Sequence, residues 1–174
     1  MVAARFFGVL AAVVVLQTEL FSELRILGVM PELLLGLTIA SAWSAGANRG
    51  ALAGFVCGFV YDVFLSTPLA LTALTYTLVG YAVGVVAENA ALEPERGLRR
   101  LVSIAGIAGG VAVFAVLGEL LAGADLVGSR LVRVVVLAPL LTAPFMPLLY
   151  RAGAWVWLSE RDAAPPRRPL RVME

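Results

Sequence analysis

The sequence contains no histidine and no lysine, and it has a single cysteine, Cys57. One cysteine cannot form an intrachain disulfide, and without histidine the chain has no Cys and His set for a zinc site. A phosphate-binding glycine loop that ends in lysine is excluded, and no nucleophile elbow occurs. The sequence therefore predicts a protein that is not an enzyme and that holds neither a metal nor another cofactor.

Charge is also scarce. Charged residues make up 14% of the chain and hydrophobic residues 61%, against about 25% and about 45–50% in soluble domains. This leaves too little polar surface for a coat that faces water. The 174 residues divide instead into membrane spans of about 20 residues each with short connections. The predicted fold class is all-α, a polytopic bundle of membrane helices.

Six hydrophobic segments predict six transmembrane helices, although five are possible. The second segment is the weakest, because Pro31 and Glu32 interrupt its start and a short apolar run can be re-entrant. We expect the bundle to cover 1–158, and we expect 159–174, which is polar and rich in proline, to be a disordered cytoplasmic tail. The six predicted spans are 6–24, 26–45 (or 31–45), 50–65, 69–87, 101–122 and 132–150.

The distribution of arginine predicts the orientation. With six spans, all but Arg25, Arg130 and Arg133 fall on the side of the C-terminus, and the positive-inside rule places that side in the cytoplasm. With five spans Arg5 and Arg25 exchange sides and the balance does not change. The rule therefore places the tail inside without choosing between the two counts. The tail arginines suit anionic lipid headgroups, and no basic patch for nucleic acid is present.

Glycine recurs at every fourth position in Gly50, Gly54 and Gly58. This spacing leaves one side of a helix flat, so that a second helix can approach closely. The sequence predicts a packing face, which can serve either contacts within the bundle or a dimer.

Asp62 follows these glycines on roughly the same side of the helix. A charge beside hydrocarbon is costly, so the carboxylate is expected to face protein or water. Three interpretations stay open. Asp62 can be a proton or cation site, it can contact a partner protein, or it can close a helix end by bonding backbone or an arginine.

Glu19 and Glu119 form a second candidate, because both lie in apolar spans toward the outer side of the six-span arrangement. Paired carboxylates can share a proton or bind a cation. The alternative is that each reaches the outer interface or meets an arginine such as Arg25 or Arg130.

Residues 31–87 carry a family resemblance. Pro31-Glu32 begins a leucine run, Gly50, Gly54, Phe55, Gly58 and Asp62 follow, and Pro68-Leu69 comes after them. This order resembles the rod shape-determining protein MreD family, in which a P-D/E-L-L-L start precedes a G-x-x-x-G-F-x-x-G-x-x-x-D run and a proline turn. The chain length and the number of spans also fit.

The resemblance implies a non-enzymatic inner-membrane component of the cell-elongation machinery that supports peptidoglycan synthesis. The implied partner is MreC, and through it RodA, its transpeptidase partner and MreB filaments. The implied fold is similar to the six-helix substrate-binding components of vitamin transporters. Asp62 matches the acid of the family pattern, with a structural rather than a catalytic role.

A second function from another class stays open, namely the substrate-binding membrane component of a small-molecule transporter. It requires a pocket with convergent polar groups. A proton-conducting role through Glu19, Asp62 and Glu119 is a third interpretation. The polar side chains available for a ligand are Gln17, Glu19, Thr72, Thr75, Asn89 and Glu119.

Overall fold

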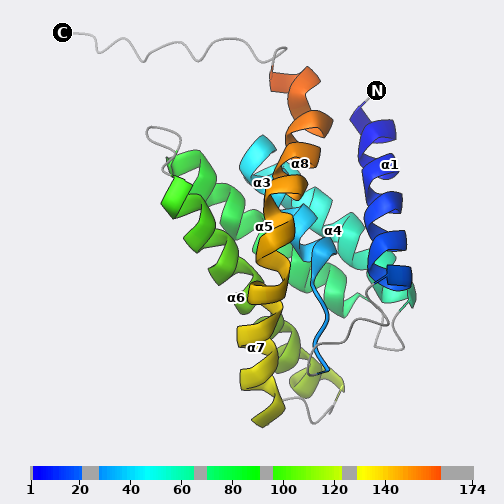
Figure 1. Ribbon diagram of the computed structural model, residues 1–174, viewed down its shortest axis with the longest axis vertical. Helices are drawn as coiled ribbons and strands as arrows, with labels where there is room; N and C mark the ends of the chain where they lie inside the picture. The colour runs from blue at the N-terminus through cyan, green and yellow to red at the C-terminus, as the bar shows by residue number, and fades with distance from the viewer. Residues whose placement is uncertain (1, 21–27, 65–69, 91–95, 123–128, 162–174) are drawn as a thin grey trace, which may run out of the picture.

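A computed structural model of the chain describes residues 2–20, 28–64, 70–90, 96–122 and 129–161. The regular elements of these residues are helices, which confirms the predicted all-α class, and Figure 1 shows their arrangement. In chain order they are α1 (Val2–Val15), the π-helix η1 (Leu16–Leu20), α3 (Leu33–Ala45), α4 (Ala47–Phe64), α5 (Leu71–Asn89), α6 (Arg96–Ala122), α7 (Ser129–Thr142), the 3-10 helix η3 (Ala143–Phe145) and α8 (Met146–Arg161).

Four of the described segments are long and apolar enough to cross a membrane. The predicted second and third spans are helical, but α3 has 13 residues and α4 is less apolar than the four. A helix of 13 residues is about 20 Å long, and the hydrocarbon layer is about 30 Å thick. Length and composition therefore establish four candidate spans, which are Val2–Glu19, Leu71–Asn89, Gly97–Leu120 and Leu131–Trp157.

Helix α3 forms the centre of the bundle. Its residues from Leu33 to Ala42 are all buried, and it contacts α1, α4, α5, α6 and α8. A helix that is apolar on every side is stable when other helices surround it. The weakest of the predicted spans is thus the one that the other helices cover most completely.

Helices α4 and α5 form a tight antiparallel hairpin beside α3. Gly50 of α4 lies against Gly80 of α5. Gly58, about two turns further along α4, lies against Ala73, which is about two turns before Gly80 in α5. The link between α3 and α4 is the single residue Gly46, with φ 85° and ψ −174°. Only glycine adopts this backbone region readily, so Gly46 allows the chain to reverse direction between two packed helices.

The last part of the chain runs through α7, η3 and α8, which follow one another along the long axis of the molecule (Figure 1). Pro139 lies inside α7, and η3 joins the two longer helices. Helix α8 extends to Arg161, three residues beyond the boundary expected at 158. The rest of the predicted tail, 162–174, lies outside the described residues. The N-terminal end of α1 and the C-terminal end of α8 lie at the same end of the bundle.

Candidate functional site

The three glycines predicted as a packing face lie in the contact between α4 and α5. A Cβ atom added to Gly50 would lie 2.5 Å from the carbonyl oxygen of Gly80, and one added to Gly58 would lie 2.5 Å from the Cα of Ala73. A Cβ on Gly54 would overlap the carbonyl group of Tyr76. The obstructing atoms belong to the backbone, so they cannot move aside as a flexible side chain can. Any side chain at these positions would push the helices apart.

Asp62 lies at the end of this contact and is 1% exposed. Its Oδ1 accepts a hydrogen bond from the N–H of Thr72 at 3.2 Å, and its Oδ2 accepts one from the N–H of Ala73 at 3.1 Å. These amides are the second and third of α5, which an N-cap side chain normally satisfies. Ala70, at the N-cap position of α5, provides no side-chain bond. Asp62 of α4 therefore caps the helix that follows it.

Two other helix starts also receive an acceptor from a different element. The N–H of Ala47, the first residue of α4, donates to Oε1 of Glu88 at 2.9 Å. The N–H of Leu34 in α3 donates to Oε1 of Gln17 at 3.0 Å. Helices leave their first amides without partners inside the helix, and the starts of α3, α4 and α5 are each completed here by a side chain from another element.

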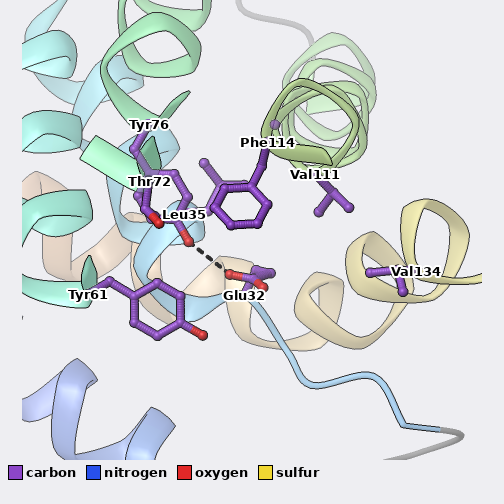
Figure 2. Close-up of a pocket in the computed structure, with 9 residues that line it drawn as sticks. Glu32, Leu35, Tyr61, Thr72, Tyr76, Val111, Phe114 and Val134 are labelled. Carbon is purple, nitrogen blue, oxygen red and sulfur yellow. Dashed lines mark hydrogen bonds between the residues drawn. The ribbon is translucent and has the colours of Figure 1, made fainter. Parts of the chain in front are cut away.

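A cavity of about 250 Å³ lies between the starts of α3 and α5, the end of α4, and helices α6 and α7 (Figure 2). Its polar lining consists of Glu32, Tyr61, Thr72 and Tyr76. The hydroxyl of Tyr76 donates to Oε2 of Glu32 at 2.8 Å. The rings of Tyr61 and Tyr76 stack with their centroids 6.5 Å apart. The remaining lining residues are Leu35, Gly110, Val111, Phe114 and Val134.

Thr72 connects this cavity with the Asp62 cap. Its N–H bonds Asp62, while its Oγ1 is buried and has no hydrogen-bond partner among the described residues. A buried hydroxyl without a partner is uncommon and requires an explanation. The side chain lines the cavity, so a bound molecule could supply the missing partner.

The structure also places the other predicted site residues. Glu19 lies on η1 and Glu119 lies near the end of α6; both side chains are exposed, and neither lines the cavity. Their action as a pair stays a prediction. Thr75 is buried, and its Oγ1 donates to the carbonyl oxygen of Leu71 at 2.9 Å. Of the six polar side chains considered for a ligand, Thr72 is the one that lines the cavity.

Sequence reasoning missed three of the four polar cavity residues. Glu32 was expected only at a helix start, and Tyr61 and Tyr76 were not expected in any site. Glu32 and Tyr76 are 44 residues apart, and the sequence holds no local signal that brings them together. Glu88 was missed for the same reason, because its partner Ala47 is 41 residues away.

Arginines lie over aromatic rings near the start of α1, α4 and α6. The guanidinium carbon of Arg5 is 5.1 Å from the ring centroid of Trp155, and that of Arg49 is 5.5 Å from the ring centroid of Trp157. Arg99 lies 4.4 Å from the ring centroid of Tyr150. Tryptophan and tyrosine are enriched where a membrane meets water, so this end of the bundle has the character of a membrane interface.

Comparison with known proteins agrees with the predicted resemblance. The family model of the rod shape-determining protein MreD matches residues 2–151. This match includes the α4–α5 contact, the Asp62 cap and the complete lining of the cavity. No curated protein and no solved structure matches the chain. The expected similarity to components of vitamin transporters therefore stays a prediction.

Proposed function

The chain belongs to the rod shape-determining protein MreD family, and from this premise we propose that it is a non-enzymatic component of the bacterial cell-elongation machinery. As a member of this family with four long apolar helices, it is an integral protein of the inner membrane that acts in cell shape. The family match over residues 2–151 is the observation that carries the proposal.

The proposed activity is binding. The chain holds MreC in the membrane and through it supports peptidoglycan synthesis by RodA and its transpeptidase partner, near MreB filaments. The packing of α4 against α5 supports such a role, because backbone-to-backbone contact makes a stiff hairpin. A stiff element can present a fixed surface to a partner, which lowers the entropy that binding costs.

We place the membrane anchor of MreC on the outer face of α4. This face carries four large exposed apolar side chains on successive turns, opposite the glycines that contact α5. Two of them, Phe55 and Phe59, stack with their ring centroids 6.1 Å apart. This aromatic pair gives a helix partner a large and rigid apolar contact area. The four residues are Leu52, Phe55, Phe59 and Val63.

We further propose six crossings with both termini in the cytoplasm. The start of α1 and the end of α8 share one end of the bundle, which requires an even number of crossings if all helices traverse. Arg5, Arg49 and Arg99 lie in the first turns of helices that begin at that end, and arginine favours the cytoplasmic side. Protein surrounds α3 on all sides, so its length need not match the lipid.

Photocrosslinking in native membranes followed by affinity purification tests the proposed function. A benzophenone amino acid at position 55 or 59 is expected to capture MreC, while the same group at the exposed position Leu120 of α6 serves as the control. Capture of MreC from position 120 alone would show that MreC contacts α6 and not α4. A folded, membrane-inserted chain that recovers no MreC from any of these positions, and none by co-purification, would overturn the proposal.

The transporter alternative gains one observation, the cavity beside Glu32. Its volume of about 250 Å³ is below the roughly 300–1,000 Å³ of sites that enclose drug-sized ligands. The cavity therefore favours a small ligand or part of a larger one over a whole vitamin. A vitamin-sized molecule retained through purification, without MreC, would favour the transporter function instead.

A further inference from the structure

We propose that the cavity beside Glu32 is a binding site for an ammonium group carried on a small apolar body. The site does not depend on the proposed role in cell elongation, and either proposal can fail without the other. It rests on the hydrogen-bonding groups that face the cavity, on its aromatic lining and on its size.

The polar wall offers mainly acceptors. Glu32 contributes a carboxylate, and the described part of the chain satisfies it only through the hydroxyl of Tyr76. Because Tyr76 uses its one proton in that bond, its oxygen can only accept a further bond. Thr72 adds a hydroxyl that has no partner in the described structure. A ligand that complements this wall must supply several donors, and an ammonium group supplies them together with a positive charge.

The aromatic lining favours the same ligand. Tyr61, Tyr76 and Phe114 contribute rings around the space that Glu32 enters, as Figure 2 shows. A cation is attracted to the face of an aromatic ring, most strongly where water is excluded. The remaining wall of Leu35, Val111 and Val134 is apolar and suits a hydrocarbon body rather than a second charge.

The cavity volume limits the ligand to a small amine or to one end of a larger molecule. Two sources supply the same chemistry. One is the ethanolamine headgroup of a membrane phospholipid, and the other is a free organic amine. Both place an ammonium group beside Glu32. Binding of a cationic amine is therefore measured first, and the lipid headgroup is then distinguished from a free amine.

The first measurement uses the full chain in nanodiscs of phosphatidylglycerol, a lipid without an ammonium group. Benzylamine, protonated at neutral pH, is the cationic probe, and benzyl alcohol is its neutral counterpart of similar shape. Titration calorimetry and the thermal unfolding midpoint report binding. We expect benzylamine to bind and to raise the midpoint, and benzyl alcohol to bind roughly tenfold more weakly or worse, because charge-assisted hydrogen bonds are the stronger ones.

Glu32→Gln keeps the shape of the side chain and removes its charge, so it is expected to weaken benzylamine binding by roughly tenfold or more. Glu119→Gln is the matched control, because Glu119 is exposed and does not line the cavity. Thr72→Val provides a second variant if Glu32→Gln fails to fold. It removes the hydroxyl while leaving the side-chain shape, and it is expected to weaken binding several-fold.

Native mass spectrometry then separates the two sources. If the headgroup is the ligand, the wild-type chain retains phosphatidylethanolamine in preference to phosphatidylglycerol, and benzylamine displaces it. If a free amine is the ligand, benzylamine binds equally well whether the nanodiscs contain phosphatidylglycerol or phosphatidylethanolamine. Equal binding of benzylamine and benzyl alcohol by the wild-type chain, or wild-type affinity in a folded Glu32→Gln variant, would overturn the proposal.

Discussion

Asp62 and Glu88 cap each other's helices. Asp62, near the end of α4, accepts hydrogen bonds from Thr72 and Ala73 at the start of α5 at 3.2 and 3.1 Å. Glu88, near the end of α5, accepts one from Ala47 at the start of α4 at 2.9 Å. An acid near the end of its own helix faces the negative end of that helix dipole. Here each acid is stabilised by the positive end of the neighbouring helix, and the hairpin is closed at both ends.

Replacement of Asp62 by alanine should destabilise the protein by about 1–3 kcal/mol, because two buried amides lose their acceptor. Asp62→Asn keeps one acceptor oxygen and should lose less. The control is Val63→Ala at the neighbouring position, whose side chain is 65% exposed. Reversible unfolding in mixed micelles measures the three free energies. Asp62→Ala with the same stability as Val63→Ala would mean that the cap contributes nothing.

Gly54→Ala should weaken the hairpin even though alanine favours helix. The added Cβ would overlap the backbone of Tyr76, so α4 and α5 must separate. Gly109→Ala is the matched control, since a Cβ there meets no atom within 4 Å. In an open helix position this change should stabilise by about 0.5–1 kcal/mol. The two variants should therefore shift the unfolding midpoint in opposite directions, and a shift of the same sign would contradict the packing argument.

The glycine face could be proposed from the sequence because a four-residue spacing is a local property of one helix. The contact partners of that face were not predictable in the same way. The sequence left three interpretations of Asp62 open. Its carboxylate oxygens accept hydrogen bonds from the N–H groups of Thr72 and Ala73, which belong to the next helix. The choice among the three interpretations depends on how α5 enters the bundle, and the spacing of residues within α4 does not determine that path.

The cavity could not be predicted from the sequence for a similar reason. Its polar residues come from the start of α3, the end of α4 and the first turns of α5, and each is unremarkable in its own segment. Glu32 and Tyr76 meet only because α3 lies in the centre of the bundle with α5 against it. The second segment was the weakest predicted span because Pro31 and Glu32 interrupt its start and a short apolar run can be re-entrant. Neither feature indicates that five other helices contact α3.

Gly46 and Glu88 should show a non-additive response to mutation. Gly46→Ala requires an unfavourable backbone conformation at φ 85° and should cost about 1–3 kcal/mol. Its Cβ would also collide with Oε1 of Glu88 and displace the cap of α4. Glu88→Ala removes that cap directly. The double variant should therefore lose less stability than the two single losses together, and a double-mutant cycle measures the difference. Strict additivity would show that the two residues act independently.

Thr142, the last residue of α7, links that helix to the start of α3. Its Oγ1 accepts a hydrogen bond from the N–H of Glu32 at 2.9 Å and donates to the carbonyl oxygen of Ala138 at 2.7 Å. Thr142→Val keeps the shape and leaves the amide without its acceptor, so it should cost about 1–3 kcal/mol. Thr142→Ser keeps the hydroxyl and should retain most of the stability. Equal losses in the two variants would assign the effect to packing rather than to the hydrogen bond.

The start of α1 and the end of α8 lie at the same end of the bundle, which predicts the side of the membrane on which α1 begins. Cys57 is 0% exposed, and Cys57→Ala gives a background in which single cysteines can be placed. Ala3→Cys at the start of α1 and Gly97→Cys at the start of α6 should both react with an impermeant maleimide only after the inner side is opened. Ser129→Cys at the start of α7 should react in intact cells. The reason is that an even number of crossings returns the chain to the side where it began. Reaction of Ala3→Cys in intact cells, with Gly97→Cys still protected, would require an odd number and would leave α3 as a helix that enters the membrane without crossing it.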